Sequence, residues 1–151
     1  MTNSNFDISA SVNKLYYRII LNELRLMNNS ANFPNISYNT LLYLDIISLT
    51  ENCTVSQLAE VLHIAKSSVT LKINELMRQG LVEKTQSKTD KRVKYLTVSS
   101  QIYKEYQYFD LATQRAIQAM AQEFSKNELA LLDKMLNQFS SYYEVGLSDE
   151  E

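Results

Sequence analysis

Residues 54–97 read TVSQLAEVLHIAKSSVTLKINELMRQGLVEKTQSKTDKRVKYLT. Hydrophobic spacing and turn residues predict four elements in this stretch: helices over 54–63 and 66–79 and strands over 81–85 and 93–98. Thr54 and Gln57 have the spacing of a capping box, and Gly80 is the residue type expected at the left-handed position after a helix. A short turn joins the helices, and a polar loop over 86–91 joins the strands. This order of elements is typical of a winged helix-turn-helix.

The composition indicates a folded and mostly helical protein. The chain has 151 residues, 45% hydrophobic and 21% charged, which suits one domain with helical extensions. Only two glycines and one proline occur, and Cys53, the single cysteine, allows no internal disulfide. The sequence contains no apolar run of roughly 18 residues, and its N-terminus lacks the pattern of a signal peptide. We therefore expect a cytoplasmic protein without a membrane-spanning segment.

Further helices are predicted on both sides of the opening stretch. Apolar residues recur at helical spacing over residues 8–27, 38–49, 100–124 and 125–143. Residues 28–35 interrupt the pattern and contain the only proline, whereas Ser125 and Glu128 form a second capping-box pair. The acidic residues from Glu144 onward are expected to fray. The predicted fold class is mainly α with a small β-hairpin wing.

The helix over 66–79 has two different faces. Val69, Ile73, Leu76 and Met77 fall on one side, which we expect to pack on the preceding helix. The other side and its flanks carry polar or charged residues and one leucine: Ser67, Ser68, Thr70, Leu71, Lys72, Asn74, Glu75 and Arg78. Such a face fits the major groove of DNA, where Leu71 would meet a thymine methyl. An ordinary amphipathic surface helix, with Leu71 merely exposed, is the alternative.

Positive charge is concentrated in the same region. Residues 54–99 carry eight basic and four acidic residues, net +4, within a chain of net charge −2. At the hairpin tip, Lys88, Lys91, Arg92 and Lys94 cluster with Asp90 between them. An arginine there fits a narrow minor groove, and Asp90 would hold its guanidinium by a charge-assisted pair. A solvated hairpin with a weak ion pair is the alternative.

Together these segments resemble the multiple-antibiotic-resistance regulator (MarR) family of bacterial transcription factors. The residues that carry the resemblance are Leu58–Ala59, Val69–Thr70, Glu75–Leu76, Gly80–Leu81–Val82, Asp90, Arg92 and Leu96–Thr97. The resemblance implies a homodimer with interleaved terminal helices that reads a pseudo-palindrome in double-stranded DNA. It also implies that Arg92 enters the minor groove with Asp90 as its partner. Two departures are Leu71, where many members carry a basic residue, and Ser100, where many carry glycine.

The terminal helices carry more apolar surface than the small wing can cover. Apolar residues of the last two helices form these faces: Ile102, Tyr106, Phe109, Ile117, Met120, Phe124, Leu129, Leu132, Met135, Leu136, Phe139 and Tyr143. We expect a partner copy to bury them, although a monomer with its own helical layer is the alternative. The predicted organisation is a winged helix-turn-helix region over 36–98 and a helical dimerisation region over 1–35 and 99–151.

Similar regulators bind a small aromatic or anionic effector, which suggests a cleft lined by Tyr16, Arg18, Tyr38 and Tyr43. The alternative is that these tyrosines belong to the core or to an interface. His63 and Cys53 are too few for a predicted metal site, and oxidant sensing by Cys53 lacks a neighbouring positive charge. No catalytic triad or glycine-rich phosphate loop is evident, so we expect neither enzymatic activity nor a cofactor.

The sequence therefore predicts a dimeric transcriptional regulator, most simply a repressor, that binds double-stranded DNA and responds to a small molecule. The alternative is a winged-helix protein-interaction module without DNA binding, which the acidic overall charge and Leu71 would favour. The operator, the regulated genes, the effector and the direction of regulation are left open.

Overall fold

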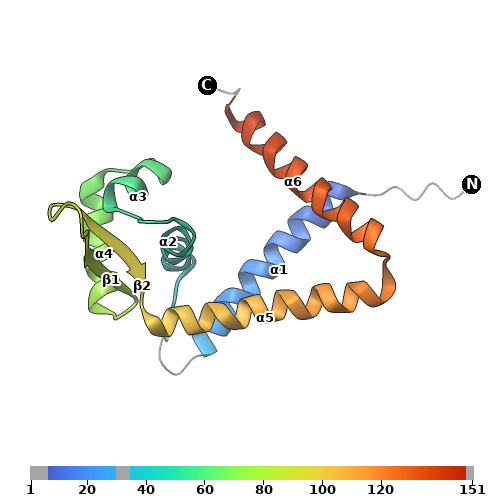
Figure 1. The fold of residues 1–151 in the computed structure, drawn as a ribbon, viewed down its shortest axis with the longest axis horizontal. Coiled ribbons are helices and arrows are strands. Elements are labelled where there is room, and N and C mark those ends of the chain that lie inside the picture. Colours follow the sequence, from blue (N-terminus) through green and yellow to red (C-terminus); the bar gives the residue numbers. More distant parts are fainter. Residues whose placement is uncertain (1–6, 30–34, 149–151) are drawn as a thin grey trace, which may run out of the picture. The chain divides into compact units, whose positions relative to one another are not determined.

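The computed structural model describes residues 7–29 and 35–148, with side chains up to residue 143. The described residues form six helices and two strands (Figure 1). The elements are α1 (Ile8–Asn29), α2 (Tyr38–Leu49), α3 (Val55–Val61), α4 (Lys66–Arg78), β1 (Val82–Gln86), β2 (Lys94–Val98), α5 (Ser100–Glu123) and α6 (Lys126–Ser148). The mainly α fold with a two-stranded wing is confirmed. Residues 30–34 of the predicted break lie outside the described residues.

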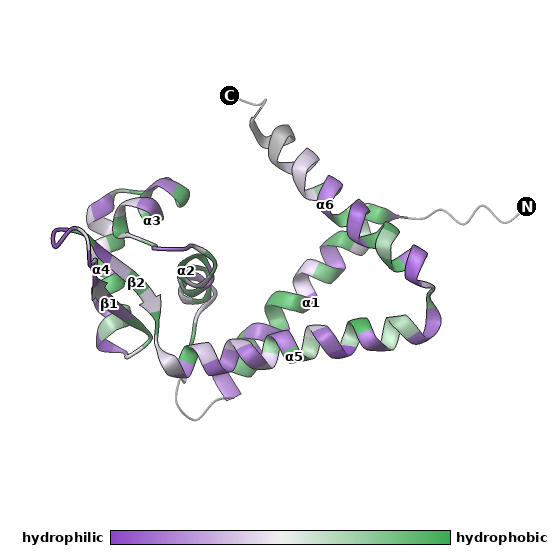
Figure 2. Cartoon of the chain, viewed as in Figure 1, coloured by the Kyte–Doolittle hydropathy of each residue, from purple (hydrophilic) through white to green (hydrophobic). Residues whose placement is uncertain are grey.

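The chain divides into two compact units. Met1–Gln107 contains α1 to α4, the hairpin and the first turns of α5, and Tyr108–Glu151 contains the rest of α5 and α6. Along α1, α5 and α6, hydrophobic and hydrophilic residues alternate, whereas α2 is hydrophobic over most of its length (Figure 2). None of the described helices is long and apolar enough to cross a membrane.

Helix α2 lies at the centre of the core of the first unit, as its apolar sequence predicts. Leu41, Leu44 and Ile47 of α2 are buried, and they share the core with residues from the neighbouring elements. Those neighbours are Met27, Leu58, Val69, Ile73, Leu76, Leu81, Leu96 and Ile102. The shared core fixes α3, α4 and the hairpin on one scaffold, because a close-packed interior resists sliding of its elements.

Side-chain caps set the starts of several helices. The Thr40 amide donates to Ser37 Oγ at 3.2 Å at the start of α2. Thr54 forms both halves of the predicted capping box with Gln57, and Ser125 and Glu128 form the second predicted pair. Each cap satisfies amide groups that the helix itself leaves unpaired, which stabilises a helix start by about 1 kcal/mol.

Positive φ angles mark two helix ends. Helix α3 ends at Val61, earlier than expected, because His63 adopts a φ of +50° and leaves the helical conformation. Gly80 has the expected left-handed conformation, with a φ of +71° after α4. Helix α6 continues to Ser148, beyond the end expected near residue 143, and the fraying expected from Glu144 onward stays a prediction. The helical backbone tolerates Gly146 there, because one glycine costs only about 1 kcal/mol.

The wing is an antiparallel hairpin attached to the segment before α3. Val82 pairs with Val98, Lys84 with Leu96, and Gln86 with Lys94. The Leu96 amide donates to the Cys53 carbonyl at 2.7 Å, so the hairpin is also bonded to the chain that leads into α3. The wing therefore has a defined position relative to the helix-turn-helix.

Candidate nucleic-acid interface

Helix α4 presents the polar face that the sequence predicts. Val69, Ile73 and Leu76 are fully buried and hold the helix against the core. Met77 was expected to pack with them, but it is 37% exposed, because it lies at the edge of the buried stripe, next to the polar face. Five of the predicted interface residues are exposed on the outer face: Ser67, Ser68, Leu71, Asn74 and Arg78.

Leu71 stands out from this face and is 71% exposed. With Asn74, Met77 and Arg78 it lines an open hollow of about 610 Å³ on the surface of α4. The apolar atoms of Leu71 and Met77 thus lie beside an amide and a guanidinium. This combination suits the edge of a base pair, which offers both a methyl group and hydrogen-bonding atoms in the major groove.

The two flanking residues of α4 already have partners in the helix. Thr70 Oγ1 donates to the Lys66 carbonyl at 2.8 Å, and Lys72 Nζ donates to Glu75 Oε1 at 3.0 Å. The Lys72 side chain is only 19% exposed. Glu75 therefore offsets much of the positive charge that the sequence suggested for Lys72.

At the hairpin tip, Asp90 organises the backbone and side chain of Arg92. Asp90 Oδ1 accepts from the Arg92 amide at 2.9 Å and from Nε at 3.3 Å, and Oδ2 accepts from a terminal guanidinium nitrogen at 3.3 Å. The amide bond and the side-chain bonds lower the pKa of Asp90, so its carboxylate stays charged. The Arg92 side chain is nevertheless 91% exposed and projects from the tip.

Sequence reasoning missed how the tip is built. Ser87 is buried, and its Oγ accepts from the amides of Thr89 and Asp90 at 3.3 Å each. Gln86 Nε2 donates to the Lys91 carbonyl at 2.6 Å and closes the loop. A serine followed within three residues by a threonine and an aspartate is the available sequence signal for such a turn. Lys88 and Lys91 are exposed at this tip, as predicted.

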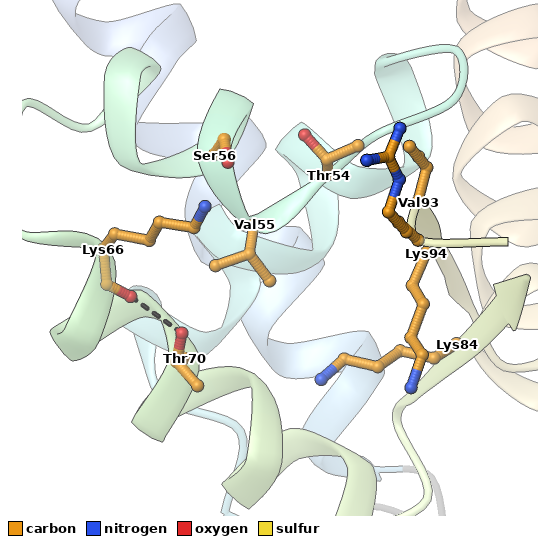
Figure 3. A pocket seen from close by; sticks show the side chains of 9 residues that line it. Thr54, Val55, Ser56, Lys66, Thr70, Lys84, Val93 and Lys94 are labelled. Atoms are coloured by element: carbon orange, nitrogen blue, oxygen red, sulfur yellow. Dashed lines mark hydrogen bonds between the residues drawn. The ribbon is translucent and has the colours of Figure 1, made fainter. Parts of the chain in front are cut away.

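A second hollow, of about 480 Å³, lies between the start of α3, one flank of α4 and the hairpin (Figure 3). Its lining residues are Thr54, Val55, Ser56, Lys66, Thr70, Lys84, Arg92, Val93 and Lys94. Most of these residues were absent from the predicted site, because they are far apart in the sequence. Lys66 and Thr70 lie on one side and Lys84 and Lys94 on the other, with Val55 and Ser56 between them (Figure 3).

The four residues of the predicted effector site do not form one cleft. Tyr16 and Tyr38 do meet, with their hydroxyl oxygens 2.8 Å apart. Tyr43 is buried in the core, where burial raises its pKa, and Arg18 is exposed on α1. The tyrosine pair is therefore the part of this prediction that the structure brings together.

Acidic groups are partly buried where α2 meets the first turns of α5. The Tyr106 hydroxyl donates to Asp45 Oδ1 at 2.6 Å, which joins the two helices. Burial raises the pKa of Asp45, and the tyrosine bond opposes that shift. The pKa of Glu23 on α1 is raised by burial and then by the nearby charge of Asp45. The Tyr106–Asp45 bond thus links α5 to the core of the first unit.

Cys53 is buried, and burial raises the pKa of its thiol. A thiol that stays protonated reacts slowly with oxidants, which weighs against a redox switch. Within the described residues, histidine, cysteine and carboxylate side chains form no group of three that could hold a metal ion.

A polar helix on a buried scaffold, followed by a hairpin with an exposed arginine, defines a winged helix-turn-helix protein of the DNA-binding class. A model of the MarR family matches residues 36–94. The transcriptional regulator AdcR of Streptococcus pyogenes serotype M6 is 27% identical over 109 residues, covering 70% of this chain and 74% of that protein.

Solved structures share the fold. FabT of Streptococcus pneumoniae, in complex with DNA, has a TM-score of 0.69 at 22% identity and covers 91% of this chain and 95% of its own. A MarR family protein from Bacillus stearothermophilus has a TM-score of 0.66 at 15% identity and covers 91% and 94%. The winged helix-turn-helix region of this chain is thus similar to the MarR family in sequence, and the chain shares its fold with solved MarR family structures.

Proposed function

We propose that this chain is a homodimeric regulator that binds a pseudo-palindromic site in double-stranded DNA. In each protomer α4 enters the major groove through Ser67, Ser68, Leu71, Asn74 and Arg78, and Arg92 enters the adjacent minor groove. The observation that carries the proposal is the exposed polar face of α4 beside an arginine that is 91% exposed on a wing bonded to the same scaffold.

The contacts have distinct roles. Hydroxyl, amide and guanidinium groups of α4 read base edges, and Leu71 contacts a thymine methyl. Lys88 and Lys91 neutralise phosphates beside the wing, and Thr70 and Lys72 support the helix through their own hydrogen bonds. Asp90 is a positioning residue, because its carboxylate holds Arg92 in one orientation before DNA arrives.

Dimerisation is supported by apolar side chains that each unit leaves exposed. Ile102 is fully buried in the first unit, so it is not available to a partner as the sequence suggested. In the second unit many apolar residues are 39% to 61% exposed: Leu111, Ile117, Phe124, Leu131, Leu132, Met135, Leu136, Phe139 and Tyr143. A second copy that buries these faces removes apolar area from water. Two protomers that read the half-sites of a pseudo-palindrome would present their α4 helices one duplex turn apart, about 34 Å.

As an effector site we propose the surface around the Tyr16–Tyr38 pair. The two phenol groups suit a small aromatic molecule that accepts or donates hydrogen bonds. AdcR of Streptococcus pyogenes is described as the adhesin competence repressor, and we propose repression here as well, relieved by the effector, in the cytoplasm. The proposal favours DNA binding over a protein-interaction module, because α4 presents an exposed polar face beside an exposed arginine and FabT, which shares the fold, is in complex with DNA.

Binding-site selection from a randomised duplex pool tests the proposal. The selected DNA should be a pseudo-palindrome, and fluorescence anisotropy should then show that Arg92→Ala weakens binding by about 1–2 kcal/mol. The matched control is Arg115→Ala, since Arg115 is also exposed but lies on α5. Failure to select any duplex contradicts the function, and equal affinities of the two variants remove the wing from it.

The dimer has its own test. Leu132→Glu combined with Leu136→Glu places charges on the exposed apolar face of α6. Sedimentation analysis should show a dimer for the wild type and a folded monomer for the variant, with loss of tight binding to the selected site. A wild-type monomer in solution contradicts the dimer.

A further inference from the structure

The hollow between α3, α4 and the hairpin contains positive charge that lacks negative partners. Lys66, Lys84, Arg92 and Lys94 contribute four cations, and none of its nine lining residues is acidic. Arg92 is paired with Asp90, but no described carboxylate lies within 4.0 Å of the other three ammonium groups. Like charges gathered without counterions repel, so a bound anion stabilises such a site.

The strand register explains why two of these lysines face the helices. Lys84 pairs with Leu96 and Gln86 with Lys94, so Lys84 and Lys94 lie on the same face of the hairpin as Leu96. Leu96 is buried against the core, which identifies this face as the inner one. Lys84 and Lys94 are therefore diagonal neighbours on the inner face of the hairpin, which borders the hollow, rather than on its outer face.

The position of the hollow matches the geometry of a duplex. One sugar-phosphate backbone separates a major groove from the adjacent minor groove. If α4 occupies the first groove and Arg92 the second, that backbone must cross the surface between them. The hollow lies there, bordered by Lys66 and Thr70 of α4 and by residues 92–94 of the wing.

We infer that this hollow seats one backbone phosphate of the bound DNA, held by Lys66, Lys84 and Lys94 with the hydroxyl of Ser56 beside them. The inference rests on the proposed function and deepens it, since it names a phosphate contact that fixes the register between the two grooves. Such a contact carries no sequence information, because every nucleotide has the same phosphate.

The test combines Lys84→Gln with Lys94→Gln and measures affinity against salt for two duplexes, the selected site and an unrelated duplex of equal length. Binding should weaken at least tenfold on both, and the slope of log K against log salt should fall by about 2, as expected for one lost phosphate in each protomer of the dimer. Lys84→Arg should keep near wild-type binding, because it keeps the charge.

A matched control combines Lys126→Gln with Lys134→Gln, which makes the same charge change at two exposed positions of α6. This control should leave the slope unchanged, and circular dichroism with a thermal melt should show that both double variants fold. Replacing chloride by inorganic phosphate at equal ionic strength distinguishes the source of the anion. Inorganic phosphate should displace no more DNA than chloride does at the same ionic strength.

Three results overturn the inference while leaving the proposed function intact. They are an unchanged slope in the Lys84/Lys94 variant, a loss confined to the selected duplex, and displacement of DNA by inorganic phosphate from the wild type alone. The last result would identify a free phosphate site. A wild-type protein that binds no duplex contradicts the proposed function itself.

Discussion

Replacing Tyr106 by phenylalanine should destabilise the first unit in a pH-dependent manner. The substitution keeps the ring and removes only the hydroxyl that donates to Asp45 Oδ1 at 2.6 Å. Hydrogen bonds to charged groups contribute about 1.5–3 kcal/mol. Because Asp45 is only half-buried and water replaces part of the lost bond, we expect a loss of about 1–2 kcal/mol at pH 7.

The pH dependence follows from the direction of the Asp45 shift. Burial raises the pKa of Asp45 above its unfolded value, and the bond from Tyr106 partly opposes this rise. A carboxyl group whose pKa is higher in the folded than in the unfolded protein stabilises the fold at pH values below its unfolded pKa, about 3.9. This stabilisation is lost as the pH rises through the pKa of the folded state. Removing the hydroxyl raises the folded pKa further, so the variant should lose more stability than the wild type between pH 4.5 and 7.

Urea denaturation at pH 4.5 and pH 7, at one fixed protomer concentration, measures both effects. Tyr103→Phe is the matched control, since Tyr103 lies on the same helix and is 60% exposed, and it should change stability by less than about 0.5 kcal/mol. The reasoning is refuted if Tyr106→Phe matches this control at pH 7, or if its loss is the same at both pH values.

The remaining predictions concern local structure. Gly80→Ala should lower the free energy of unfolding by about 1 kcal/mol in urea denaturation. The added methyl meets no atom within 4 Å, so only the φ of +71° opposes the substitution. An unchanged free energy of unfolding would contradict this prediction. Leu76→Ala should lower the free energy of unfolding by about 2–5 kcal/mol in the same assay, because the Leu76 side chain is fully buried. A decrease below about 1 kcal/mol would show that neighbouring side chains move to fill the cavity. Cys53 should react with a thiol reagent only as fast as the native state opens; reaction at the rate of a free thiol would contradict its burial.

Much of the local structure was predictable because it depends on near neighbours in the chain. The Thr54–Gln57 and Ser125–Glu128 caps form between residues three positions apart, and Gly80 ends α4 through its own backbone. The buried stripe of α4 follows from helical periodicity, except at Met77, which lies at its edge. The exposed polar face and the Asp90–Arg92 contact were predictable for the same reason.

The partners of other residues depend on packing between distant segments. Tyr43 turns inward, away from the proposed effector surface. The Lys72–Glu75 pair, which weakens a predicted cation, joins residues only three positions apart, so helical spacing could have indicated it. The predicted division at residues 98 and 99 stays a prediction, although the first turns of α5 share a compact unit with the winged helix through the Asp45–Tyr106 bond. Sequence spacing carries no signal for a bond between residues so far apart.

The amino-acid sequence alone determined the order of the elements, the faces of α4 and the residues at the wing tip, because helix periodicity, capping and turn chemistry act over a few residues. Only the tertiary structure decided that Lys66, Lys84 and Lys94 line one hollow with Ser56. Their convergence requires the strand register and the burial of Leu96 and Leu58 in one core. Long-range packing, rather than local propensity, thus sets where the unpaired positive charge is concentrated.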